Sequence, residues 1–171
     1  EDELGLVLSD SVRAVTGDAR VNVGRVEEGS MDLVIGDAFG GEAVPWHLTT
    51  QEFVEQIRST LRPGGVYALN AIDHGPLDFV RAEVATLRQV FEHVAVIAPA
   101  DRIARRTDGG NFILVASDEP IPADRIQQVN TARGDDDTVL SDAAGLDDFV
   151  GGAQVLTDEF APVDQLLTVK V

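Results

Sequence analysis

Two short apolar runs, each closed by a glycine and an aspartate, lie in the first quarter of this chain. The first covers residues 12–16 and leads into Gly17-Asp18, and the second covers residues 31–35 and leads into Gly36-Asp37. Apolar, β-branched runs that end at glycine turns are typical of strands, and three apolar residues in a row in the second run suit a strand buried on both faces. Because ligands of open α/β sheets bind beyond the carboxyl ends of the strands, we expect Asp18 and Asp37 to share one crevice.

Alternating helix and strand patterns follow these two runs. Thr49 or Thr50 is suited to cap a helix that continues to residue 62, where Pro63-Gly64-Gly65 stops it. A buried strand is predicted over residues 66–72. Further strands are predicted over residues 94–97 and 112–115, with a loop between them, and helices near residues 123–131 and 143–150.

A helix predicted to start at Pro76 has its own apolar pattern. We expect Phe79, Val84 and Leu87 to face inward, and Glu83, together with the neighbouring arginines, to face solvent.

Length and composition limit the class of protein. With 171 residues and 44% hydrophobic residues, we expect one α/β domain over residues 1–171, with residues 118–171 as a C-terminal extension packed on it. A net charge of −17 argues against nucleic-acid binding, which depends on lysine and arginine. The sequence has no apolar run long enough for a membrane span and no cysteine, which is compatible with a cytoplasmic protein.

Several segments resemble the later motifs of class I S-adenosylmethionine-dependent methyltransferases, namely Gly17-Asp18-Ala19, residues 31–37 and residues 61–66. The spermidine synthase family of polyamine aminopropyltransferases is the closer match. Residues 37–53 fit the spacing of that family's acidic loop and next helix start, and residues 156–164 resemble the ending of bacterial spermidine-synthase-like proteins. The resemblance implies a Rossmann-like sheet, mostly parallel with an antiparallel edge.

The resemblance also implies an N-terminal part that this sequence lacks. The family's first strands and its Gly-rich cofactor turn have no counterpart, and residues 1–6 look like the tail of a helix that follows the second strand. We therefore expect at least two βα units, of about 30 residues each, to be absent upstream, in a fragment or in a naturally short protein with weak donor binding. The strand of residues 12–16 would lose its neighbours, so we expect either its rearrangement or a homodimer sealed across that edge.

The activity implied by the resemblance is aminopropyl transfer from decarboxylated S-adenosylmethionine to putrescine or a related amine, a step of polyamine biosynthesis. The catalytic carboxylate would be Asp37, which takes a proton so that the attacking amine has a free lone pair. Asp18 and Ala19 would hold adenine, and Val44 with Pro45 would wall the purine. The alternative for both aspartates is an ordinary role in a turn or a helix cap.

Substrate contacts are implied for four further residues: Asn70, Trp46, Asp158 and Asp164. A lone loop tryptophan more often packs on its own domain, and the two aspartates could instead cap a helix or a turn. No spacing among the three histidines suggests a metal site.

Departures from the family pattern keep two other functions open. Gly40 and Gly41 stand where the family has an acid and a proline, and residues 99–103 lack the expected aromatic residue. One alternative is methyl transfer from intact S-adenosylmethionine to another acceptor. The other is a non-catalytic module whose open sheet edge mediates assembly.

Overall fold

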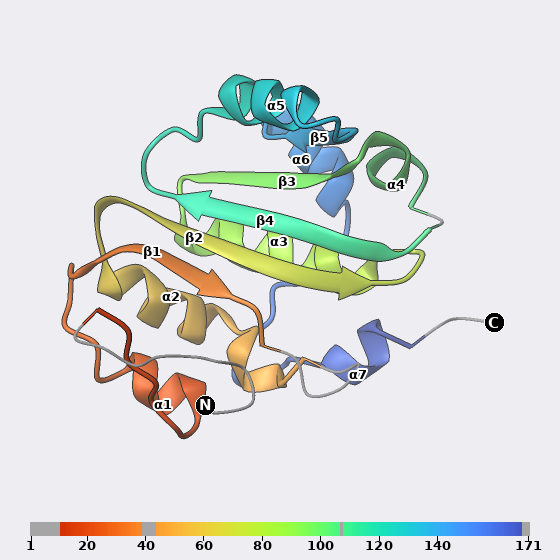
Figure 1. Cartoon of the computed structure of the whole chain (residues 1–171). Helices are drawn as coiled ribbons and strands as arrows, with labels where there is room; N and C mark the ends of the chain where they lie inside the picture. The colour runs from red at the N-terminus through yellow and green to blue at the C-terminus, as the bar shows by residue number, and fades with distance from the viewer. Residues whose placement is uncertain (1–10, 39–43, 107, 169–171) are drawn as a thin grey trace, which may run out of the picture.

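A single five-stranded mixed sheet organises the chain (Figure 1). The structure is a computed structural model that describes residues 11–38, 44–106 and 108–168. Its strands, in the spatial order β1-β2-β4-β3-β5, are β1 (Met31–Gly36), β2 (Leu61–Asp73), β4 (Gly110–Ser117), β3 (His93–Pro99) and β5 (Asp137–Leu140). β1 and β2 pair in parallel, and the other three pairings are antiparallel. The predicted α/β fold class is confirmed, but among the described strands the sheet is mixed and not mostly parallel as expected, because only β1 and β2 pair in parallel.

Helices α2 and α3 lie together on one face of this sheet (Figure 1). The helices of the described residues are α1 (Ala19–Val23), α2 (Gln51–Thr60), α3 (Asp78–Val90), α4 (Ala100–Arg105), α5 (Ala123–Ala132), α6 (Ala143–Val150) and α7 (Val163–Leu166), with a short 3-10 helix at Trp46–Leu48. In the part of the chain that the structure describes, no helix is long and apolar enough to cross a membrane.

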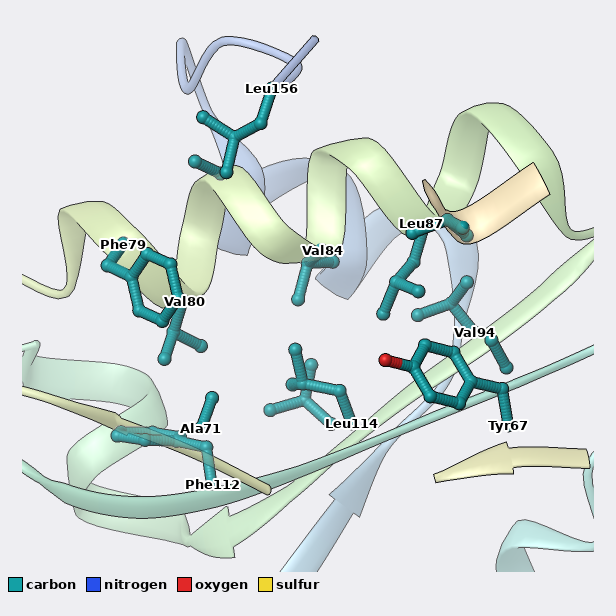
Figure 2. Packing of buried hydrophobic residues seen from close by; sticks show 14 of the residues in the cluster. Tyr67, Ala71, Phe79, Val80, Val84, Leu87, Val94, Phe112, Leu114 and Leu156 are labelled. Atoms are coloured by element: carbon teal, nitrogen blue, oxygen red, sulfur yellow. The ribbon is translucent and has the colours of Figure 1, made fainter. Parts of the chain in front are cut away.

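The core forms between α3 and the sheet (Figure 2). Phe79 and Val80 on α3 point toward Ala71 and Phe112 on the strands, and Leu114 lies between the layers. These side chains are at most 1% exposed, so their burial supplies much of the hydrophobic stabilisation of the fold.

Most of the predicted elements are confirmed. The Thr50 hydroxyl accepts a hydrogen bond from the Phe53 backbone N–H, which is the N-cap contact expected at the start of α2. The helices predicted near residues 123–131 and 143–150 are α5 and α6. Sequence analysis missed α4, inside the predicted loop before β4, and it missed β5, which begins in the acidic turn at Asp137.

The prediction that Glu83 faces solvent is wrong. Glu83 is 1% exposed, because α3 is covered on several sides by the sheet, α2, α6 and α7. Because neighbouring elements enclose α3, position 83 does not face solvent.

The predicted strand of residues 12–16 is also wrong, and Asp18 does not end a strand. Residues 13–16 have no strand conformation, Val15 is 72% exposed, and Asp18 begins α1 instead. A strand needs a neighbour for its backbone hydrogen bonds, and β1 is bonded only to β2 among the described strands. Rearrangement of this segment was one of the two outcomes expected for it.

The sheet face opposite α2 and α3 carries exposed apolar side chains. Side chains alternate along a strand, so Leu33 and Ile35 on β1 point away from the helices, next to Val66 and Ala68 in the register. Leu33 is 51% exposed and Ile35 is 69% exposed. This apolar face lies beside the open edge of β1, the edge at which no described strand pairs with it.

Candidate functional site

A pocket of about 240 Å³ lies where the carboxyl ends of β1 and β2 meet α1, α2 and α3. Four residues assigned to a site from the sequence line its wall, namely Ala19, Asp37, Val44 and Asn70. The other lining residues are mostly apolar and come from the helices and the strands, so a ligand inside would be largely desolvated.

Asp37 directly follows β1 and is held by a chain of two amides. The Asn70 side chain on β2 donates from Nδ2 to Asp37 Oδ1 over 3.0 Å. Asn111 on β4 donates from Nδ2 to Asn70 Oδ1 over 3.1 Å, which keeps the donor end of the Asn70 amide turned toward Asp37. The arrangement fixes one carboxylate oxygen and leaves Asp37 in the wall of the pocket.

Gly36 creates space beside Asp37. A Cβ atom at position 36 would lie 2.7 Å from the Tyr67 hydroxyl oxygen and 3.0 Å from a Leu69 methyl carbon. Both side chains line the pocket, so the missing side chain of glycine keeps this part of it open.

Glu83 and Tyr67 add buried polar groups to the same pocket. Glu83 Oε1 has no hydrogen-bond partner among the described residues, and burial raises the pKa of this carboxyl well above its ordinary value. Burial, and then the charge of Glu83, raise the pKa of the Tyr67 hydroxyl. Sequence analysis missed both residues. The available signal was spacing, since Glu83 lies four residues after Phe79 and four before Leu87 on the apolar stripe of α3.

Asp18 lies at the start of α1 and not in the wall of the pocket. Its Oδ1 accepts the Val21 backbone N–H over 3.0 Å, and its Oδ2 lies 3.1 Å from His47 Nε2. The Val21 hydrogen bond and the neighbouring His47 lower the pKa of the Asp18 carboxyl. The structure therefore gives Asp18 the cap role that was its alternative, next to Ala19 in the pocket wall.

Asp158 is tied to a residue that sequence analysis did not select. Arg20 donates to both Asp158 carboxylate oxygens over 2.7 Å, and the Thr50 hydroxyl donates to Asp158 Oδ1 over 2.8 Å. These hydrogen bonds, led by that from Arg20, lower the pKa of the Asp158 carboxyl. They hold the closing segment of the chain against α1 and the start of α2.

A second hollow, of about 390 Å³, collects the remaining predicted residues. Pro45, Trp46 and Asp164 line it, and Val44 contributes to both this hollow and the first pocket. Trp46 is 49% exposed, and its ring meets the His47 ring edge-on at a centroid distance of 5.8 Å. Larger hollows elsewhere on the surface contain none of the predicted site residues.

Two glycines that depart from the family pattern and a cluster of three aspartates lie outside the pocket as described. Gly40 and Gly41, the departures from the family pattern, lie outside the described residues. Among the described residues, one cluster of carboxylates has metal-like spacing, formed by Asp135, Asp136 and Asp137 at the start of β5. β5 is at the opposite edge of the sheet from β1, so this cluster is separate from the pocket.

Comparison with known proteins gives a consistent result. No protein-family model matches the chain. A curated polyamine aminopropyltransferase from Vibrio vulnificus (strain CMCP6) is 38% identical over 85 residues, which are 48% of this chain and 28% of that protein. The crystal structure of a probable spermidine synthase from Corynebacterium glutamicum ATCC 13032 matches with a TM-score of 0.80 and 32% identity, over 92% of this chain and 58% of that one.

This chain resembles the spermidine synthases in both sequence and fold. It spans little more than a quarter of the curated relative and 58% of the Corynebacterium chain. The fold is also shared with human methyltransferase-like protein 13, solved in complex with SAH, at a TM-score of 0.56 and 17% identity. The likeness to spermidine synthases predicted from the motifs is therefore confirmed, and the roles of single residues remain predictions.

Proposed function

We propose that this chain is a spermidine synthase-like aminopropyltransferase that moves an aminopropyl group from decarboxylated S-adenosylmethionine to putrescine or a related amine. The observation that carries the proposal is the position of Asp37, at the carboxyl end of β1, in a pocket wall and held by Asn70. The likeness to a curated polyamine aminopropyltransferase and to a probable spermidine synthase supports this reaction class.

The proposed chemistry needs a carboxylate beside the amine. The amine nitrogen attacks the carbon bonded to the sulfonium sulfur, and a C–N bond forms while the C–S bond breaks. The electron pair of the broken bond stays on sulfur, which leaves as the neutral thioether methylthioadenosine. The proton of the attacking nitrogen goes to the Asp37 carboxylate, which acts as the general base.

On the donor side, Ala19 and Val44 would contact the nucleoside through the pocket wall, with Asp18 and Pro45 close to them in sequence. A sulfonium nucleoside is the ligand class we propose, in keeping with the SAH-bound methyltransferase-like structure that shares the fold. Trp46, Asp158 and Asp164 would border the amine. Arg20 already neutralises the Asp158 carboxylate, so we propose that Asp158 helps to position the amine.

The test is product formation by the full chain. We expect methylthioadenosine to be released when the chain is incubated with putrescine and millimolar decarboxylated S-adenosylmethionine, a concentration chosen to compensate for weak donor binding. Asp37→Asn should lower kcat by about 10²–10⁴-fold, the usual contribution of a general base. Asp32→Asn is the matched control, because Asp32 is an exposed acid of the same strand that pairs with Arg62.

Each result has a clear meaning. Unchanged kcat in Asp37→Asn would remove this residue from the mechanism, and an effect on KM alone would make it a binding residue. If intact S-adenosylmethionine is consumed and S-adenosylhomocysteine appears, the reaction is methyl transfer. If neither donor is turned over and neither changes the melting temperature, the chain is a non-catalytic module.

We also propose that the chain self-associates. The open edge of β1 and the exposed side chains of Leu33 and Ile35 form an apolar surface of the kind that subunits cover. The small-molecule amine remains the other partner proposed, and the charge of −17 disfavours nucleic acid.

A further inference from the structure

The Arg20 side chain joins α1 to three other parts of the chain. Its Nη1 lies 3.2 Å from the His47 carbonyl oxygen, 3.4 Å from the Thr50 hydroxyl and 2.7 Å from Asp158 Oδ1, and it donates to all three acceptors. Its Nη2 donates to Asp158 Oδ2 over 2.7 Å. One guanidinium group therefore connects α1 with the 3-10 helix at Trp46–Leu48, the start of α2 and the closing segment.

α1 depends on contacts of this kind because it is short and poorly buried. It has five residues, none of them buried, and Val21 is 53% exposed. Val23 is partly buried against the core. A single helical turn is not stable through its own backbone hydrogen bonds, and little apolar burial supports this one. The hydrogen bonds of Arg20 therefore contribute much to the position of α1.

The closing segment offers Arg20 a partner that is fixed by other contacts. Leu156 is 1% exposed, and its backbone N–H donates to the Thr86 hydroxyl on α3 over 2.9 Å. Its carbonyl oxygen accepts the Gln51 backbone N–H at the start of α2 over 2.8 Å. Asp158 follows two residues later, so its ion pair with Arg20 holds α1 against elements of the core.

α1 and the 3-10 helix contribute neighbouring walls of the pocket. Ala19 and Val23 are four residues apart, so they lie on one face of α1, and both line the pocket. Leu48 of the 3-10 helix lines it as well. The two helices contact each other. Their relative position therefore determines the shape of this part of the pocket.

His47 is held against α1 at two points. Its carbonyl oxygen accepts from Arg20, and its ring Nε2 lies 3.1 Å from Asp18 Oδ2. The side chains of His47 and Asp18 are 32% and 47% exposed, whereas that of Arg20 is 19% exposed. Hydrogen bonds that are better shielded from water contribute more to position, so we expect the Arg20 contact to dominate.

We infer that Arg20 is a positioning residue that fixes α1 against the 3-10 helix and thereby sets the affinity of the pocket for the ligand between them. The identity of that ligand, the donor nucleoside beside Ala19 and Val44, rests on the proposed function. Arg20 is not among the described residues that line the pocket, so it acts through the two walls. The proposed base Asp37 is held by Asn70 instead, which separates donor binding from proton transfer.

Amide hydrogen exchange of the full chain, without ligand, tests the positioning. The Leu48 and Thr49 backbone N–H groups donate to the carbonyl oxygens of Pro45 and Trp46. In Arg20→Gln, we expect these two amides to exchange faster by about tenfold more than the amides of α3, which report global stability. Arg20→Lys keeps a charged donor and should show a smaller change.

Calorimetric titration with methylthioadenosine, the thioether product, tests the effect on affinity. Arg20→Gln should weaken its binding about tenfold and raise the KM for the donor more than it lowers kcat. Asp158→Asn removes the ion pair from the other side and should also weaken methylthioadenosine binding. Arg25→Gln is the matched control, because Arg25 is exposed, follows α1 directly after Gly24 and contacts Asn22 instead. It should leave the exchange rates and the affinity unchanged.

The inference is overturned if Leu48 and Thr49 exchange no faster relative to α3 in Arg20→Gln, or if methylthioadenosine binds equally well to this variant and to wild type. Neither measurement requires turnover. Faster local exchange in a chain that binds no nucleoside would refute the proposed donor and leave the positioning of the two helices standing. Turnover with an unchanged donor KM in Arg20→Gln would do the reverse.

Discussion

Arg20 and Asp158 are 138 residues apart in the chain and form a two-point ion pair, with both nitrogen–oxygen distances at 2.7 Å. The Arg20 side chain is 19% exposed and that of Asp158 is 37% exposed. The pair holds the closing segment of the chain against α1, and both of its side chains are only partly exposed to solvent.

We expect this ion pair to contribute more to stability than a fully exposed one. In a double-mutant cycle with Arg20→Gln and Asp158→Asn, the coupling free energy should be about 1 kcal/mol, the upper end for partly exposed pairs. The Arg58–Asp118 pair, with side chains 50% and 40% exposed, is the control and should couple by less than about 0.5 kcal/mol. Urea unfolding measures both cycles, and equal coupling energies would contradict the prediction.

Thr50→Ala should destabilise the fold by about 1–2 kcal/mol, since it removes the N-cap of α2 and a hydrogen bond to Asp158. Thr50→Ser keeps the hydroxyl and serves as the control, with a loss expected below about 0.5 kcal/mol. Thermal unfolding followed by circular dichroism compares the variants. A loss of equal size in both would show that the methyl group, and not the hydrogen bonds, stabilises this position.

Asn70→Ala should lower kcat of the proposed reaction, because Asp37 loses the amide that positions it. Asn111 contacts only the Oδ1 end of the Asn70 amide, so Asn111→Ala should lower kcat less than Asn70→Ala does. The order of kcat expected in steady-state kinetics is wild type, Asn111→Ala, Asn70→Ala and Asp37→Asn. If Asn111→Ala has a lower kcat than Asn70→Ala, the proposed positioning of Asp37 by Asn70 is wrong.

Glu83→Gln should raise the stability of the empty protein at neutral pH and flatten its pH dependence. The folded state keeps the Glu83 proton to a higher pH than the unfolded chain, whose glutamate has a pKa of about 4.3. Above that pH the folded state binds more protons, so the stability of wild type falls as pH rises, by up to about 1.4 kcal/mol per pH unit. The variant lacks this contribution.

Urea titrations between pH 5 and 8 check this prediction, with Glu92→Gln as the matched surface control. Asp73, whose pKa is also raised by burial, stays in both proteins and leaves a shallower slope. The lowered pKa values of Asp18 and Asp158 affect stability only below the ordinary aspartate range, near pH 4, so they do not enter this window. Parallel curves for wild type and Glu83→Gln would show that Glu83 is ionised when buried.

Ile35→Asp should weaken the proposed self-association at least tenfold, since it places a charge on the apolar face beside the open edge of β1. Sedimentation velocity across a concentration series measures the effect. Val129→Asp, at an exposed apolar residue of α5, is the control and should leave association unchanged. A wild-type chain that sediments as a monomer at all concentrations would rule out the proposed dimer.

Local patterns in the sequence were enough to predict the elements that depend on local rules. Thr50 was predicted as a possible helix cap from its residue type, and α6 was predicted within its observed bounds. The strand β1 and the position of Asp37 at its carboxyl end followed from three consecutive apolar residues, but the predicted burial of β1 on both faces is wrong, since Leu33 and Ile35 are exposed.

Pairing and enclosure, in contrast, depend on parts of the chain that are distant in sequence. Residues 13–16 have strand-like composition but no strand conformation, since no described strand pairs with them, and Asp18 caps a helix. The burial of Glu83 and the contact of Arg20 with Asp158 arise only when other elements pack around them. The sequence by itself thus determined the local elements and the acid at the end of β1, since these follow from residue type and spacing. Only the tertiary structure decided which side chains share the pocket, because burial and hydrogen-bond partners are set by the whole fold.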